Sequence, residues 1–368
     1  MTDYYLRYLT VDGVQALNVP DFSRLEYTLA ENEVGVLELS LPFSQFSHFI
    51  WPPILDGRLE VYRRVGAGAY YLDGGCQWLL RDWTLEKSGN ESVISLRAYH
   101  TNHILGRRIV AYNADTSQTA KTDYIDDMMK EIVYENYLAG AVAARDISAY
   151  MTAQADLSLA PRKSKAFSRR NILTILQELA QLSYENGTYL VFDTVKTGDA
   201  LTEFRTYVNQ RGVNRGTTGA APLTVSVEND GLTEPVLAYA YADEINYIYA
   251  GGKGEGSLRV IQEASDAVRL AASVLNRSEY FYDARNGSDD PADLLSEAEE
   301  QLAERRPRVM FDAVLHENQN LLYGIHYNWG DIVTAQYQGM VFDCHVDIVN
   351  VVVEGGNETV TAKIHGEV

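Results

Sequence analysis

Residues 326–368 constrain the fold more than any other part of this chain. They read HYNWGDIVTAQYQGMVFDCHVDIVNVVVEGGNETVTAKIHGEV, with apolar residues alternating along two runs and a glycine turn between them. A period of two is typical of strands that bury one face. A Gly-Asp pair, Gly330 and Asp331, stands at the entrance of the stretch. These residues predict a closing β structure, and none of them has the character of a catalytic group.

The first part of the chain, residues 1–111, also reads as strands and turns. Two β-prone runs flank residues 87–92, which predicts a hairpin. A second strand pair is expected over residues 25–42, where alternation is mixed with continuous burial at Val34, Val36, Leu37, Leu39 and Leu41. So many short strands at short spacing predict a small barrel or sandwich.

The pattern changes to a helical one near residue 112. One apolar stripe repeats at helical spacing, at Ile125, Met128, Met129, Ile132 and Val133. Thr122 or Asp123 is the expected N-cap. Asp126 and Asp127 are expected to interact favourably with the positive end of the helix dipole.

A second amphipathic helix is predicted before residue 187. Its inner stripe is Ile172, Ile175, Leu176, Leu179 and Leu182 or Ser183. Gly187 is expected to end it as the C′ residue. Strands follow over residues 188–195 and 201–212, so the middle of the chain is predicted to be α+β.

Residues 211–222, RGVNRGTTGAAP, are expected to form a flexible loop. Strands are predicted again after it, as far as residue 264. A helix then follows with Asp290 as its cap, Pro291 at its first position and Pro307 beyond its end. From Arg308 onward the sequence predicts strands only.

Composition excludes several classes of function. The chain has 368 residues, of which 46% are hydrophobic and 22% charged, so it is long enough for two or three domains. Its net charge of -20 provides no basic surface to grip phosphates. Its two cysteines, Cys76 and Cys344, make neither a disulfide framework nor a zinc cluster. No secretory signal pattern and no apolar run of about 18 residues is visible.

Two motifs resemble binding sites without meeting their requirements. The glycines of AGGKGEGSLR, at positions 251, 252, 254 and 256, miss the spacing of phosphate-binding and dinucleotide-binding loops. His100 and His103 could meet one metal if they shared a helix, but a third ligand is not apparent. We therefore expect no cofactor-binding and no metal-binding residue.

Carboxylates and one basic segment complete the candidate chemistry. Asp82, Glu86, Asp243 and Glu244, with Trp78 and Trp83 nearby, could serve a glycosidase only if two carboxyls lie about 5–9 Å apart. The chain holds 51 acidic residues, so such pairs occur by chance and no catalytic residue is assigned. The basic segment could pair with an acidic neighbouring subunit or simply be a solvated loop; it comprises Arg162, Lys163, Lys165, Arg169 and Arg170.

The order of these elements resembles the hub proteins of tailed-phage tails, the baseplate hub or tail-tip family, including the N-terminal part of tail-associated lysins. Three stretches carry the resemblance: residues 80–137, residues 168–193, and YNWGDIVTAQYQG with the closing hairpin. In the last of these, Gly330 and Asp331 resemble the family's turn into its final barrel. The resemblance extends over nearly the whole chain.

The resemblance implies a specific architecture. Two similar small β-barrels would comprise residues 1–111 and residues 223–262 with 308–368. An α+β middle domain, residues 112–222, would join them, and a helical insertion, residues 263–307, would pack with that domain. The expected fold class is thus α+β, mainly β.

The resemblance also implies a non-enzymatic role. Three copies would form a ring with six barrels that joins the tail tube to the tip and leaves a channel for DNA ejection. Expected partners are further copies in a homotrimer and the neighbouring distal tail ring, tube, spike or fibre, with DNA passing unbound. The expected location is the virion tail tip, after assembly in the bacterial cytoplasm. Two alternatives stay open: a carbohydrate-binding or glycan-hydrolysing module of the tail tip, and an unrelated secreted β-rich enzyme.

Overall fold

The computed structural model describes residues 2–19, 21–47, 51–88, 91–111, 119–285 and 290–367. Contacts within the chain group it into two compact units. The large unit is built mainly on residues up to Pro235 and on Asp312–Gly366, and the small unit on Val236–Phe311. These units are coarser than the four-part division expected from the sequence, which stays a prediction. Among the described residues, no helix combines the length and the apolar character needed to cross a bilayer.

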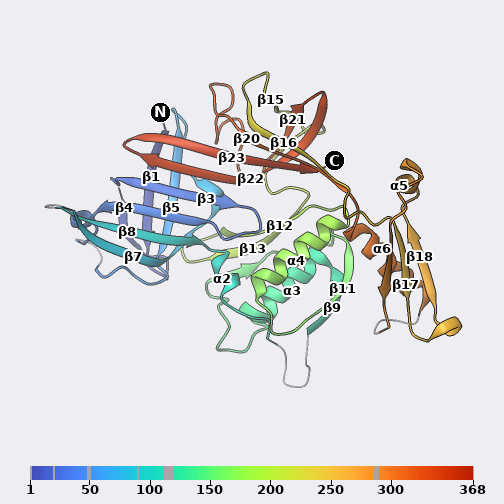
Figure 1. Ribbon diagram of the computed structural model, residues 1–368. Helices are drawn as coiled ribbons and strands as arrows, with labels where there is room; N and C mark the ends of the chain where they lie inside the picture. The colour runs from blue at the N-terminus through green and yellow to red at the C-terminus, as the bar shows by residue number, and fades with distance from the viewer. Residues whose placement is uncertain are drawn as a thin grey trace. The chain divides into compact units, whose positions relative to one another are not determined.

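Most of the large unit's strands belong to one extended sheet (Figure 1). Its fifteen strands are β1 (Thr2–Leu9), β2 (Gln15–Val19), β3 (Arg24–Ala30), β4 (Val36–Pro42), β5 (Arg58–Val65), β6 (Tyr71–Leu72), β7 (Trp78–Ser88), β8 (Glu91–His100), β14 (Asn214–Arg215), β15 (Thr224–Ser226), β16 (Leu232–Ala240), β20 (Arg308–Leu315), β21 (Ile332–Tyr337), β22 (Met340–Glu354) and β23 (Asn357–Glu367). The main path runs β16-β20-β23-β22-β3-β4-β8-β7-β5-β1-β2. Strands therefore dominate, and the expected mainly β, α+β class is confirmed.

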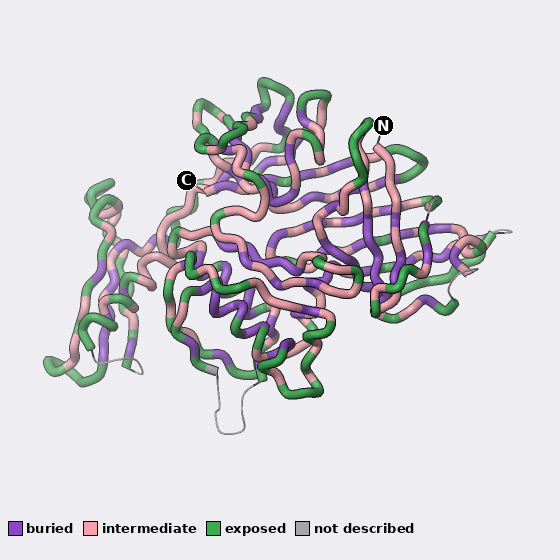
Figure 2. Tube along the Cα trace, turned by 180° about the vertical axis from the view of Figure 1, so that it is seen from behind, coloured by how far each residue is buried: buried purple, intermediate pink, exposed green. Residues whose placement is uncertain are grey.

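The predicted strand pairs form where alternation is clearest. Buried and less buried residues alternate along the strands (Figure 2), as they do at Leu37, Leu39 and Leu41 of β4. β4 pairs antiparallel with β3, and β7 pairs antiparallel with β8, as expected. The turn between β7 and β8 is shorter than predicted, because Lys87 and Glu91 already belong to the two strands. The centre of that predicted turn lies outside the described residues.

The two ends of the chain share one sheet. β22 pairs antiparallel with β3, so that Glu354 lies opposite Arg24 and Ile348 lies opposite Ala30. The sheet path has two free ends in the described part of the chain and does not close on itself. The expectation of two separate closed barrels is therefore not confirmed. The reason is physical: a strand edge left by one half of the chain is satisfied by a strand from the other half.

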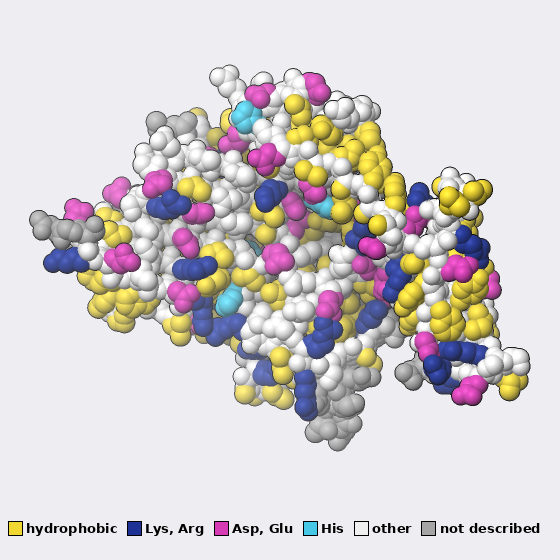
Figure 3. Space-filling view, viewed as in Figure 1, with side chains coloured by type: hydrophobic (Ala, Val, Ile, Leu, Met, Phe, Trp, Pro, Cys, Tyr) yellow, Lys and Arg dark blue, Asp and Glu magenta, His cyan; other side chains and the backbone are white. Residues whose placement is uncertain are grey.

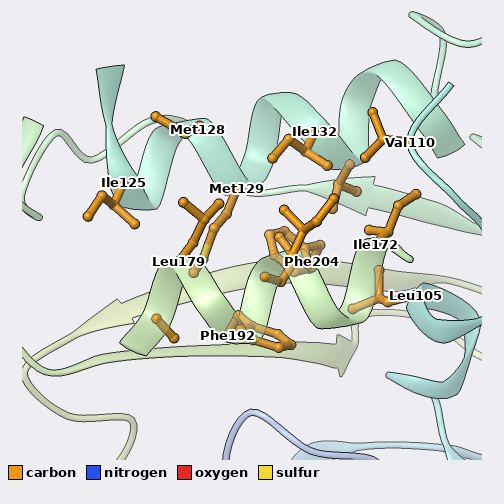
Figure 4. Packing of buried hydrophobic residues seen from close by; sticks show 14 of the residues in the cluster. Leu105, Val110, Ile125, Met128, Met129, Ile132, Ile172, Leu179, Phe192 and Phe204 are labelled. Carbon is orange, nitrogen blue, oxygen red and sulfur yellow. The ribbon is translucent and has the colours of Figure 1, made fainter. Parts of the chain in front are cut away.

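Two helices, α3 (Ile125–Tyr137) and α4 (Ile172–Glu185), form the middle of the large unit. They pack with a three-stranded sheet of β10 (Met151–Ala153), β13 (Thr202–Val208) and β12 (Leu190–Lys196), beside a pair of β9 (Thr119–Tyr124) and β11 (Arg162–Phe167). Figure 4 shows Met129, Ile132, Leu179 and Phe204 in their shared core. Both predicted apolar stripes are buried, which confirms the two helices. Each large side chain buried in this way contributes about 1.5–3 kcal/mol.

The start of α3 differs from the prediction. Its N-cap is Tyr124, whose side chain makes no capping bond. Thr122 and Asp123 are wrong as caps because both lie in extended β9, paired with β11. Asp126 and Asp127 do occupy the first turn. There they accept hydrogen bonds from backbone N–H groups of the segment before β11.

The end of α4 follows the prediction. Gly187 adopts a left-handed φ of +83° just after the helix. Its N–H donates to the carbonyl of Tyr184 at 2.9 Å, and the N–H of Thr188 donates to the carbonyl of Ser183 at 3.0 Å. These two bonds form a Schellman motif, which satisfies carbonyls that a helix end otherwise leaves unpaired.

The small unit is a three-stranded sheet covered on one face by a helix. β17 (Tyr247–Gly251) lies between β18 (Ile261–Ser265) and β19 (Glu279–Asp283), and α6 (Pro291–Glu304) packs on β17 and β18. As predicted, the Asp290 side chain caps α6 by accepting from the N–H of Ala292 at 2.8 Å, and Pro291 opens the helix. The remaining described helices are short: α1 (Phe43–Ser47), α2 (His103–Gly106), α5 (Ala267–Ala272), η1 (Asp73–Gly75) and η2 (Gly256–Leu258).

Candidate functional site

His100 and His103 do not form a metal site in this structure. His100 ends strand β8, whereas His103 opens the short helix α2 and stacks on Tyr99 with ring centroids 4.9 Å apart. Burial lowers the pKa of His100, and its Nδ1 accepts the N–H of Asn102 at 3.1 Å. The protonated Nε2 then faces the Asp193 carboxylate at 3.4 Å. Across the described residues, no three His, Cys, Asp or Glu side chains converge as metal ligands would.

Arg211, which the sequence places in a flexible loop, forms the centre of a buried contact. Its Nε and Nη2 donate to Asp193 at 2.9 and 2.7 Å, and Nη2 also donates to the carbonyl of Gly74 at 2.7 Å. The guanidinium lies 3.9 Å from the ring centroid of Trp329. This residue thus connects β12, η1 and the segment before β21. In the sequence, Arg211 is simply an arginine in a glycine-rich stretch. That signal does not distinguish a buried arginine from a solvated one.

The candidate glycosidase carboxylates are not arranged as a catalytic pair. Asp82 and Glu86 lie four residues apart on exposed β7, a separation of about 13 Å along a strand. Retaining and inverting glycosidases need about 5–9.5 Å. Glu244 is buried in the small unit, where two 2.8 Å bonds from Arg269 lower its pKa. An ionised, paired carboxylate is unsuited to donate a proton.

The tryptophans predicted to accompany these carboxylates also separate. Trp78 is buried against Tyr27, whereas Trp83 is exposed and meets Trp51 edge-on, with ring centroids 5.2 Å apart. The two side chains therefore do not line one sugar site.

The glycine loop and the basic segment are both engaged in contacts within the fold. In the loop after β17, Arg259 donates to the carbonyls of Gly251 and Gly252 and to Asp283. Only the single turn η2 follows, so a phosphate-binding helix N-terminus is absent from this described loop. Most of the basic segment is strand β11, and Arg170 forms an ion pair with Glu178 of α4.

Gly330 and Asp331 build the turn that the sequence singles out. Gly330 has a left-handed φ of +84°, and an added Cβ would lie 2.8 Å from the Cβ of Arg211. The buried Asp331 carboxylate accepts the N–H of Val213 at 2.6 Å and Nε of Arg215 at 2.9 Å. This anchor places β14 parallel to β21, so the predicted flexible loop of residues 211–222 contains a short strand instead.

The small unit leaves the face opposite α6 open. Tyr247 and Tyr249 of β17 and Phe281 of β19 share this face, because Ile248 and Ala250 point to the other side. Arg277 lies 3.9 Å from the ring centroid of Tyr247 and also hydrogen-bonds to the hydroxyl of Tyr249. Tyrosine and arginine together are the composition typical of the centre of protein interfaces.

Apolar side chains are also exposed at both ends of this sheet (Figure 3). Leu258 is 84% exposed in the connection between β17 and β18. Val268, Val274 and Leu275 are 80%, 99% and 90% exposed in the connection between β18 and β19. Exposure of this extent in one small unit is typical of surfaces that other chains cover.

Comparisons with solved structures show the fold. The 43 kDa tail protein of prophage MuSo2 from Shewanella oneidensis superimposes with a TM-score of 0.56 at 9% identity, covering 99% of this chain and 98% of the other. A tail protein from Neisseria meningitidis MC58 gives 0.52 at 10% identity, with coverage of 99% and 96%. Prophage tail protein gp18 from Listeria monocytogenes EGD-e gives 0.52 at 12% identity, with coverage of 99% and 94%.

The fold is therefore that of phage tail proteins, as the sequence resemblance predicts. A search of curated protein sequences gives no match. The sequence itself matches the model of one protein family over residues 13–364, nearly its whole length. This chain belongs to the siphovirus ReqiPepy6 Gp37-like protein family.

Proposed function

We propose that this protein is a structural subunit of the tip or baseplate of a phage tail, located in the virion. The fold shared with three tail proteins and the family membership support this role. The role we propose is a non-enzymatic one, as the sequence resemblance implies.

The observation that carries the proposal is the surface of the small unit. Four apolar side chains that are at least 80% exposed lie at the ends of a sheet whose open face carries Tyr247, Tyr249 and Phe281. A soluble monomer gains nothing from keeping such groups in water, since burial contributes about 25 cal/mol per Å². A subunit of an assembly recovers this free energy at its interface.

The assembly we propose is a homotrimer whose copies form a ring around a channel. Each copy would contribute the two β regions expected from the sequence, residues 1–111 and residues 223–262 with 308–368, to give six around the axis. A ring requires heterologous contacts that close after a fixed rotation. The small unit supplies an apolar surface for one side of such a contact. Neighbouring tail-tip proteins would bind the two faces of the ring.

The channel would pass DNA without holding it. The net charge of -20 supports this, because an acidic wall repels phosphates. A basic or neutral channel wall in an image of the assembled ring would contradict this part of the proposal.

Mass in solution is the direct test. Native mass spectrometry and light scattering of the full chain should give three times the subunit mass. Electron microscopy of the same sample should show a ring with an open centre. A stable monomer at micromolar concentration would contradict the homotrimer.

One observation favours a glycan-binding module as the second candidate. Trp51 and Trp83 are 48% and 40% exposed and adjoin each other, with Phe43 4.9 Å from the Trp51 ring. Exposed aromatic rings of this kind stack on sugars. Incubation with bacterial cell-wall glycans distinguishes the candidates: a monomer that binds the glycans or releases reducing sugars supports a module, and a trimer that does neither supports the hub.

A further inference from the structure

A cavity of about 310 Å³ lies in the large unit, between the strand end of β1 and helix α2. Its residues come from five separated segments of the chain. They are Val11, Asp56, Arg58, Leu79, Ile104, Arg107, Arg108, Ile147 and Tyr150. Three arginines and one aspartate give this wall an excess of positive charge in a chain that is strongly acidic overall. The net charge of the whole chain, -20, has the opposite sign.

Arg58 is the central feature of the cavity, because it is a buried cation that forms no ion pair with a carboxylate of the described residues. The residue is only 4% exposed. Its Nε donates to the carbonyl of Val11 at 3.1 Å, and its Nη1 donates to Oε1 of Gln77 at 2.6 Å. Nη2 has no hydrogen-bond partner among the described residues. Burial lowers the pKa of Arg58, and the charges of Glu60, Asp56 and Asp12 oppose this shift.

The carboxylates near Arg58 accept hydrogen bonds or ion pairs from other residues. Glu60 receives Arg7 at 3.1 Å, Lys196 at 2.9 Å and the side-chain amide of Gln77 at 2.7 Å. Asp12 accepts the hydroxyl of Tyr150 at 2.8 Å. Asp56 lies between Arg81 and Arg107, the latter at 3.5 Å. Each acid is therefore committed to another donor.

Arg108 adds a second guanidinium without a carboxylate partner in the described residues. Its Nη1 donates to the backbone carbonyl of Asn136 at 2.8 Å, and its guanidinium lies 4.5 Å from the ring centroid of Tyr137. Buried cations are normally paired, since burying an unpaired charge is costly. Arg58 is buried and Arg108 half-buried, and neither has a carboxylate partner among the described residues, which favours an anion supplied from outside the fold.

We propose that this cavity binds a monovalent carboxylate attached to an aliphatic stem, with Arg58 as its main ligand. The guanidinium of arginine matches a carboxylate through parallel N–H bonds. Leu79, Ile104 and Ile147 provide the apolar wall for the stem. Asp56 in the cavity wall disfavours a dianion such as phosphate, because its negative charge repels a doubly charged ligand more than a singly charged one. The carboxylate could belong to a free acid or to an acidic side chain of a second copy.

Butyrate is a suitable probe, and butyramide is its uncharged counterpart of the same shape. Thermal unfolding and calorimetric titration of the full chain are run in a carboxylate-free buffer at constant ionic strength. Butyrate should raise the melting temperature of the wild type, while butyramide, sodium chloride and inorganic phosphate should not. Arg58→Gln and the more exposed Arg107→Gln should each weaken butyrate binding by about tenfold or more. Arg97→Gln, on exposed β8 outside the cavity, is the matched control and should bind as the wild type does.

Mass in solution then identifies the source of the carboxylate. If a second copy supplies it, Arg58→Gln and Arg107→Gln lower the oligomer mass, and butyrate does the same to the wild type. If a free acid supplies it, the mass is unchanged while the variants lose butyrate binding. The proposal is overturned if butyrate and butyramide act alike, if phosphate binds more tightly, or if Arg107→Gln folds and binds butyrate normally. Should Arg58→Gln not fold, the Arg107→Gln result decides alone.

Discussion

The Arg63 guanidinium and the Glu358 carboxylate meet through two hydrogen bonds, 3.0 Å from Nε to Oε2 and 2.6 Å from Nη2 to Oε1, although 295 residues separate them. Arg63 lies on β5 and Glu358 on β23, which are far apart along the sheet path. The sheet must therefore curl to bring these strands together. The side chains of Arg63 and Glu358 thus connect two strands that make no backbone hydrogen bonds with each other.

Breaking this pair is expected to destabilise the large unit strongly. Arg63→Met leaves Glu358 largely buried without its cation, which should lower the free energy of unfolding by about 3–5 kcal/mol. Urea unfolding followed by circular dichroism measures the change. The exposed pair of Arg97 and Glu38 is the control, and Arg97→Met should cost less than about 1 kcal/mol. Equal losses for both variants would show that Arg63 has no special role.

Asp331→Asn should release the short strand β14. The amide offers one oxygen where the carboxylate offers two, so either the N–H of Val213 or the Arg215 guanidinium loses its acceptor. We expect a loss of about 1–3 kcal/mol. Hydrogen exchange should quicken at residues 213–215. Asp230→Asn, in an exposed turn, should leave exchange at these residues unchanged; unaltered protection in Asp331→Asn would contradict the anchor.

The stability of the protein should depend on pH through Glu31. Burial raises the pKa of Glu31 to about 8, while the unfolded carboxyl titrates near its usual value of about 4.3. Between these values the folded state holds a proton that the unfolded state has lost. Raising the pH through this window therefore lowers the free energy of unfolding, by at most about 1.4 kcal/mol per pH unit.

Glu31→Gln tests this dependence. The variant keeps a neutral side chain beside the hydroxyl of Tyr189, which lies 2.7 Å from Oε2 in the wild type. Urea unfolding from pH 5 to 8.5 should show the wild type losing stability relative to the variant as pH rises. Titrating groups that do not interact with Glu31 are common to both proteins and cancel in the difference. Parallel curves would contradict the assignment.

Charges on the exposed apolar ends of the small unit should weaken the assembly. The double variant Val274→Asp/Leu275→Asp places two carboxylates where both side chains are almost fully exposed. Folding should be unaffected because neither side chain packs in the core, whereas a contact that buries them would lose several kcal/mol. Mass in solution across a dilution series measures the shift toward monomer. Leu159→Asp, 62% exposed on the large unit, is the matched control and should assemble normally.

The local sequence pattern was sufficient to predict the main helices and some of their ends. The stripe from Ile125 to Val133 and that from Ile172 to Leu179 predict two helices, and both are buried against one core. Asp290 and Pro291 predict the start of α6, and Gly187 predicts the end of α4. These features depend on neighbours within a few residues, which a sequence displays directly. The cap of α3 was missed because Asp123 pairs with a strand some 40 residues away, at Lys163.

The sequence by itself determined the two strand pairs β3–β4 and β7–β8, the helices α3, α4 and α6, the acidic charge and the family resemblance of this protein. Only the tertiary structure decided that β3 pairs with β22, that Arg63 reaches Glu358, and that Arg58 has no ion-pair partner among the residues described. The physical reason is that strand pairing and ion pairing between distant segments depend on how the whole chain closes. Alternation specifies which face of a strand is buried, and many partners satisfy that requirement equally well.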